Sequence, residues 1–116
     1  MILRTLAISL SFFLIGQVFA ENWPGFRGPL SNGKSSEKNL PLKWSSTENV
    51  LWKTKLPGPG SSSPIIWNDK VFISQSVDKA GNERALLCLD RKNGNVLWSK
   101  TVRFDGKEPT HATNPY

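Results

Sequence analysis

The stretch Cys88–Trp98, which reads CLDRKNGNVLW, decides the fold that we predict for this chain. Its last four residues, NVLW at Asn95–Trp98, already occur at Asn49–Trp52, 46 positions earlier. A tetrapeptide that recurs at such a spacing indicates a structural unit that the chain builds more than once.

Short apolar runs separated by turn residues surround the repeated tetrapeptide. No window keeps a 3.6-residue apolar period, and no helix could cross the proline- and glycine-rich stretch Leu56–Pro64. Strands are predicted on both sides of a turn at Asn68–Asp69, over Arg84–Asp90 and over Asn95–Val102. Asn93–Gly94 predicts the hairpin between the last two strands, because both residues accept positive φ.

Four antiparallel strands in such a short stretch are the content of one β-propeller blade, and the repeat period suits such blades. The predicted fold class is therefore all-β, a β-propeller. The second NVLW closes the first blade, over 62–102, and the first NVLW begins the outer strand, 49–56, of a blade whose other strands lie elsewhere. Trp52 and Trp98 are expected to lie between blades, where each ring buries a large apolar area.

The stretch Cys88–Trp98 also resembles the repeat of the quinoprotein-like propellers, the pyrroloquinoline quinone (PQQ) repeat A-x-D-x-x-T-G-x-x-x-W. Asp90, Gly94 and Trp98 match this motif, while Cys88 stands at the alanine and Asn93 at the threonine. Both replacements keep the character of the position, a small buried side chain and a polar turn residue.

The first copy of the repeat matches less well. It keeps Thr47 and Trp52, but Trp44 stands at the aspartate position and Glu48 at the glycine. Other stretches look like the N-terminal part of exported PQQ-like propeller proteins of planctomycete type, namely NWPGFRGP, LPLKWS, NVLWKTKLPGPGSSSP and HATNPY.

The resemblance implies a ring of seven or eight blades, in which residues 49–56 would complete the last blade. Eight repeats need on the order of 370 residues. The chain is therefore expected to be an N-terminal fragment or a truncated product, with the remaining blades as its partners. Its expected parts are a signal peptide over 1–20, an N-terminal strap over 21–48, the propeller repeat over 49–104 and an inter-blade loop over 105–116.

In the dehydrogenases of this family the ring holds PQQ with a calcium ion and uses a catalytic aspartate. No residue of this sequence can be assigned to these roles, so PQQ with calcium is expected from the resemblance only. Asp90 belongs to the repeat turn, where an aspartate caps local backbone donors.

The first twenty residues, MILRTLAISLSFFLIGQVFA, predict a secretory signal peptide that is cut after Ala20. Arg4 precedes the apolar run Leu6–Ile15, which is too short for a membrane anchor, since a spanning helix needs about 20 apolar residues. The mature chain is expected to be periplasmic or secreted, with no membrane span.

The net charge of +6 comes from basic residues that are scattered singly, so no nucleic-acid-binding face is predicted. Cys88 is the single cysteine and cannot form an internal disulfide, although an exported compartment would permit one. One cysteine and one histidine also exclude the usual four-ligand zinc site within this chain.

Three residues are candidates for a ligand loop. His111 and Asn114 lie in THATNPY, an irregular segment expected between blades, where the histidine could titrate or bind a metal. Arg27 in WPGFRGP suits a bidentate contact with a carboxylate or phosphate. The alternatives are an exposed loop histidine and a strap pinned to the ring by Trp23 and Phe26.

Three functions are compatible with these patterns. The first is a binding or scaffold module of the bacterial cell envelope, with an envelope protein or a small molecule as its ligand. It accounts for the absence of a catalytic constellation in the sequence. The second is a fragment of a PQQ-dependent dehydrogenase that oxidises alcohols or sugars. The third is a stand-alone exported β-domain that binds a partner by strand addition.

Overall fold

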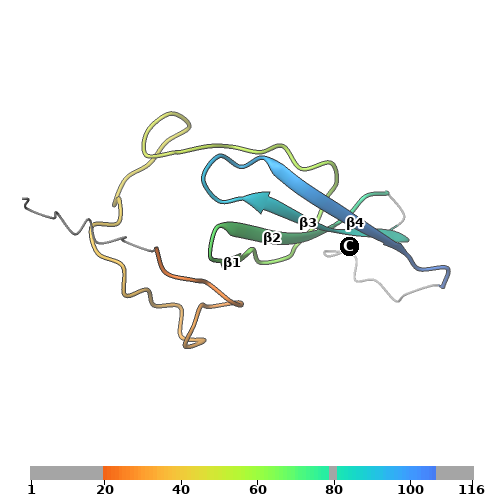
Figure 1. The fold of residues 1–116 in the computed structure, drawn as a ribbon, viewed down its shortest axis with the longest axis horizontal. Coiled ribbons are helices and arrows are strands. Elements are labelled where there is room, and N and C mark those ends of the chain that lie inside the picture. Colours follow the sequence, from red (N-terminus) through yellow and green to blue (C-terminus); the bar gives the residue numbers. More distant parts are fainter. Residues whose placement is uncertain (1–19, 79–80, 107–116) are drawn as a thin grey trace, which may run out of the picture.

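The computed structural model of the chain describes residues 20–78 and 81–106. They form one antiparallel sheet in sequence order (Figure 1), made of β1 (Ile65–Trp67), β2 (Lys70–Ser76), β3 (Glu83–Asp90) and β4 (Val96–Arg103). The described residues contain no helix. The all-β prediction is confirmed, and the four predicted strands are all present.

One face of the sheet is covered, and it holds the core. Ala85, Leu87 and Leu89 alternate along β3 and are all buried. Val71 and Ile73 of β2 stand opposite Leu89 and Leu87, so their side chains share this face. Leu56 and Val77 pack against the same cluster from outside the sheet. We call this the covered face, because the chain before β1 crosses it (Figure 1).

The opposite face of the sheet is largely exposed and carries the basic residues Lys70, Arg84 and Lys100 beside its apolar side chains, and we call it the open face. Phe72, Cys88 and Trp98 lie side by side across β2, β3 and β4, and the two rings are 6.0 Å apart between centroids. Cys88 is fully buried in this row. Other exposed apolar side chains of this face flank the row, namely Ile65, Trp67, Leu86 and Val102.

The hairpin between β3 and β4 differs from the predicted one. Of the predicted pair, only Gly94 has positive φ, at 74°, whereas Asn93 does not. The Asp90 carbonyl accepts a hydrogen bond from Gly94 N at 2.8 Å, and Asp90 N donates to the Asn95 carbonyl at 2.8 Å. The loop is therefore longer than a two-residue turn. The register then shifts between Cys88 and Leu89, so β4 carries a bulge there.

No strand is formed by residues 49–56 in the structure. Leu56 of this segment packs on the core of the covered face, and Trp52 and Thr54 contact the β3–β4 turn. The strand partners expected for the segment would belong to another blade. Its assignment as an outer strand therefore stays a prediction. In the strap, Trp23 alone pairs with the sheet, through a bridge to Ile66 at the edge of β1.

Candidate functional site

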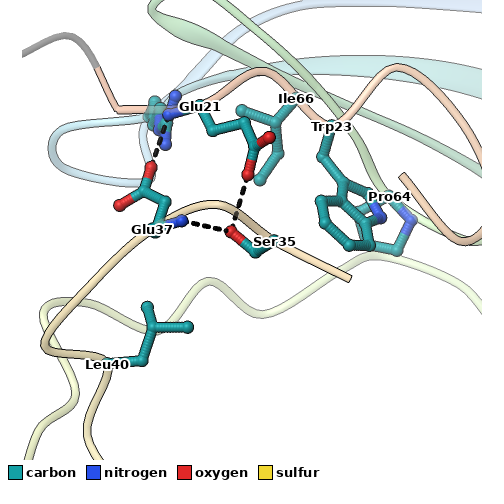
Figure 2. A pocket seen from close by; sticks show the side chains of 8 residues that line it. Glu21, Trp23, Ser35, Glu37, Leu40, Pro64 and Ile66 are labelled. Carbon is teal, nitrogen blue, oxygen red and sulfur yellow. Dashed lines mark hydrogen bonds between the residues drawn. The ribbon is translucent and has the colours of Figure 1, made fainter. Parts of the chain in front are cut away.

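A pocket of about 520 Å³ lies between the strap and the edge of β1, and we call it the strap pocket (Figure 2). Trp23, Pro64 and Ile66 form its apolar side, and Glu21 and Glu37 carry carboxylates to the opposite side. Its remaining lining residues are Ser35, Leu40 and Arg91.

Backbone pairing fixes the apolar side of the pocket. Trp23 N donates to the Ile66 carbonyl at 2.8 Å, and Ile66 N donates back to the Trp23 carbonyl at 2.9 Å. Asn68 N also donates to Asn22 Oδ1 at 2.6 Å. Gly28 packs on the Trp23 ring so closely that a Cβ on Gly28 would lie 2.7 Å from ring carbons. The strap therefore lies along β1 in a defined register.

Two serines of the strap hold the carboxylate of Glu21. Ser35 Oγ donates to Glu21 Oε2 at 2.6 Å, and Ser36 N donates to the same oxygen at 3.1 Å. Ser36 Oγ reaches Glu21 Oε1 at 3.2 Å. These donors, the Ser35 hydroxyl first, hold the pKa of Glu21 below its usual value of 4.5. Glu37 Oε1 accepts a hydrogen bond from Glu21 N.

Arg91 brings a positive charge to the same pocket. Its backbone N donates to the Asp69 carbonyl at 2.9 Å, which ties the β3–β4 loop to the β1–β2 turn. Its guanidinium donates to the Asn68 and Ala20 carbonyls, each at 3.3 Å. The polar groups of Glu21, Glu37 and Arg91 are largely hydrogen-bonded within the chain. The residues around the strap pocket therefore serve first of all to anchor the strap to the sheet.

The anchoring by Glu21 should depend on pH. Its folded-state pKa is lowered, so its contribution is fully present above pH 4.5 and is lost as pH falls through the lower folded-state value. We expect the Ser36 amide proton, followed by NMR in a pH titration, to shift with a midpoint below 4.5. Ser35→Ala should raise this midpoint, whereas Ser46→Ala, a change at an exposed serine without a bond to Glu21, should not. A midpoint at or above 4.5 in the unsubstituted chain would contradict the geometry.

A second set of contacts joins the end of the first NVLW to the turn before the second NVLW. Trp52 of the first copy donates from Nε1 to the Arg91 carbonyl at 2.8 Å. Thr54 Oγ1 donates to the Gly94 carbonyl at 2.6 Å. The ring lies so close to Gly94 that a Cβ there would be 2.4 Å from Trp52 Cε3. The tryptophan of one copy thus rests on the turn of the next.

Asp90 shapes the turn on which Trp52 rests. Its Oδ1 accepts hydrogen bonds from Lys92 N at 2.7 Å and Asn93 N at 3.3 Å, which is the local capping expected of it. Cys88 lies just before this turn on β3 and is fully buried. Asp90 and Cys88 therefore both have structural roles in this hairpin.

Of the residues predicted for a ligand loop, Arg27 is described by the structure and does not line the strap pocket. Arg27 is exposed, and its carbonyl accepts a hydrogen bond from Gly33 N at 2.8 Å within a local turn. Phe26 is 75% exposed and does not hold the strap to this sheet, whereas Trp23 does. A contact of these residues with a propeller ring stays a prediction. The turn closed by Gly28 N and the Gly25 carbonyl, 3.0 Å apart, puts Gly28 on the Trp23 ring and leaves Phe26 outside. His111 and Asn114 lie outside the described residues.

Glu21, Glu37 and Arg91 are the pocket residues that sequence reasoning missed. Glu21 bonds to residues 14 to 16 positions away in irregular chain, where no periodicity links them. The only cue in the sequence is the short polar run Ser35–Glu37.

Across residues 20–78 and 81–106 no group of three or more His, Cys, Asp and Glu side chains could hold a metal ion. These residues thus provide no set that fits the calcium ion of the dehydrogenases, and PQQ with calcium stays an expectation from the resemblance. The same part of the chain contains no helix that is long and apolar enough to cross a membrane.

Comparison of the chain with protein-family models, curated proteins and solved structures gives no match.

Proposed function

We propose that this chain is the leading part of an exported PQQ-like β-propeller that serves the bacterial cell envelope as a binding or scaffold module. In this proposal β1 to β4 form the first blade, and residues 49–56 are the outer strand that completes the last one. The leader over 1–20 would be removed after Ala20.

The contact between Trp52 and the turn at Gly94 carries this proposal. It joins the last residue of the first NVLW, Trp52, to Gly94, the residue that directly precedes the second NVLW. A contact of this kind can propagate along a repeat array, because each unit then buries its surface against its neighbour. By the same rule, Trp98 would rest on the corresponding turn of the next repeat.

The open face gives separate support. Both faces of this sheet carry large apolar side chains, and the part of the chain that the structure describes covers only one of them. The other face presents Trp67, Leu86 and Val102 with exposed fractions of 53%, 43% and 67%. Apolar patches of this kind mark surfaces that meet another protein surface. The next blade is the partner that a propeller would supply.

The mass of the native processed protein, isolated from its own cells, tests the proposal. Eight repeats on the observed period would give a product of about 40 kDa whose first residue is Glu21. A stable product that consists of residues 21–116 alone would contradict a ring built from one chain. Oxidation of alcohols or sugars with an artificial dye, after loading of the isolated protein with PQQ and calcium, would favour the dehydrogenase alternative.

A further inference from the structure

Glu21 lines the strap pocket and is the first residue of the processed chain in the proposed function. Its backbone nitrogen donates a hydrogen bond to Glu37 Oε1 (Figure 2). Removal of the leader, which is part of the proposed function and on which this inference rests, would cut the bond that joins Ala20 to this nitrogen. The nitrogen would then be the free amino group of the processed chain.

A ring of three hydrogen bonds holds the Glu37 carboxylate at this nitrogen. Glu21 N donates to Glu37 Oε1, Glu37 N donates to Ser35 Oγ at 3.1 Å, and Ser35 Oγ donates to Glu21 Oε2 at 2.6 Å (Figure 2). Glu21 and Glu37 are both half-buried. The carboxylate therefore stands in place before the nitrogen carries a charge, and an ammonium formed there would lose little freedom in meeting it.

The charges around the strap pocket are unbalanced. Its lining residues include two carboxylates, those of Glu21 and Glu37, and one guanidinium, that of Arg91, which leaves a net charge of −1. The Arg91 guanidinium donates to the Asn68 and Ala20 carbonyls, each at 3.3 Å. After cleavage the Ala20 carbonyl would leave with the leader, and Arg91 would keep the Asn68 carbonyl. A positive charge on the Glu21 nitrogen would make the pocket neutral.

Cleavage supplies that positive charge. A peptidase that hydrolyses the bond between Ala20 and Glu21 consumes one water molecule, whose oxygen becomes part of the Ala20 carboxylate and whose two hydrogens pass to the Glu21 nitrogen in the net reaction. The nitrogen changes from an amide, which takes up no proton near neutral pH, to an α-amine with an ordinary pKa of about 7.7–8.0. The amine is therefore largely an ammonium at neutral pH.

We propose that removal of the leader locks the strap, because the new α-ammonium of Glu21 forms an ion pair with the Glu37 carboxylate. Charge-assisted hydrogen bonds are about twice as strong as those between neutral groups. Trp23, two residues further on, pairs with Ile66 at the edge of β1, so the ion pair fixes the strap where it joins the sheet. The precursor has only a neutral amide at this point, so the lock is a property of the processed chain alone.

The reactivity of the α-amine measures the ion pair in the native processed protein. N-terminal sequencing first establishes that the chain begins at Glu21. Another first residue would overturn the lock together with the cleavage site, whereas a product of residues 21–116 alone would contradict the ring and leave the lock intact, since both partners belong to the strap. A short pulse of acetic anhydride at neutral pH then labels neutral amines, and mass spectrometry of the N-terminal peptide gives the rate for Glu21.

Glu37→Gln should make the α-amine react about two- to fivefold faster. The variant keeps an oxygen that accepts from the amine and removes the negative charge. In the unsubstituted protein this charge holds the pKa of the α-amine above its ordinary value and so lowers the reactive fraction. Glu48→Gln, at an exposed glutamate of the same strap, is the matched control and should leave the rate unchanged. An unchanged rate in Glu37→Gln, or equal acceleration in both variants, would refute the ion pair.

Complete acetylation of the α-amine tests the lock through stability. The acetyl group restores an amide at Glu21 like that of the precursor, because it keeps one N–H donor and removes the charge. Acetylation should lower the unfolding temperature, and Glu37→Gln should lower it in the protein with a free amine but much less in the acetylated protein. An equal loss in both forms would mean that Glu37 serves only as an acceptor for an amide, and it would overturn the lock.

Discussion

Gly94→Ala is expected to lower the free energy of unfolding by about 2–4 kcal/mol, which combines backbone strain with overpacking. Gly94 has a φ of 74°, a conformation that alanine adopts only with strain. The new Cβ would also lie 2.4 Å from Trp52 Cε3 and 2.5 Å from Thr54 Oγ1. Trp52 and Thr54 would have to leave the turn, and the covered face would lose part of its cover.

Urea unfolding of the full chain, followed by tryptophan fluorescence, measures this effect. Gly25→Ala is the matched control, because a Cβ on Gly25 meets nothing within 4 Å. The control should change the free energy of unfolding by less than about 0.5 kcal/mol. Equal effects of the two substitutions would show that Trp52 does not rest on the turn in solution.

Trp52→Ala is expected to cost about 3 kcal/mol, the lower end of the range for removal of a buried aromatic ring, because Trp52 is half-buried. The substitution removes the ring from the turn and leaves the Arg91 carbonyl without its bond to Trp52 Nε1. The same urea experiment gives the value. Trp44→Ala is the control, since Trp44 is 69% exposed, and it should be close to neutral. A loss as large in the control would mean that the measured effect comes from the unfolded chain.

The double variant Trp52→Ala with Gly94→Ala separates the overpacking that Gly94→Ala causes from the backbone strain that it causes. Without the indole ring, the methyl group that Gly94→Ala adds would have no ring to meet, so the double variant should lose less stability than the sum of the single variants. A coupling of about 1 kcal/mol or more is expected for residues in direct contact. Additive losses would indicate that Gly94 acts through backbone strain alone.

The strands were predictable because each depends on local patterns. Ala85, Leu87 and Leu89 show the period of two that a sheet imposes, and turn residues mark the ends of the runs. The turn at Asn93 was less predictable. The carboxylate of Asp90 pairs with the backbone N–H groups of Lys92 and Asn93, which favours a longer loop in which Gly94 alone needs positive φ.

The contacts of the strap and the burial of Gln75 could not be predicted in the same way. Glu21 meets Ser35 and Ser36 only because the bridge between Trp23 and Ile66 holds the strap beside β1. Gln75 looks in the sequence like one polar residue near the end of a strand, and its isolation becomes visible only when the loop at Gly60 closes over it. Contacts between irregular segments leave no period in the sequence, so only the folded chain reveals them.

The burial of Cys88 has a consequence for how the protein can be observed. Its thiol lies in the row between Phe72 and Trp98 and has no exposed surface, so a thiol reagent can reach Sγ only when the neighbouring side chains or the strands themselves move apart. When this opening closes again quickly, the rate of labelling reports the population of the opened state. The chain therefore carries its own reporter of opening at this face, and in an oxidising compartment its sulfur is vulnerable only during those openings.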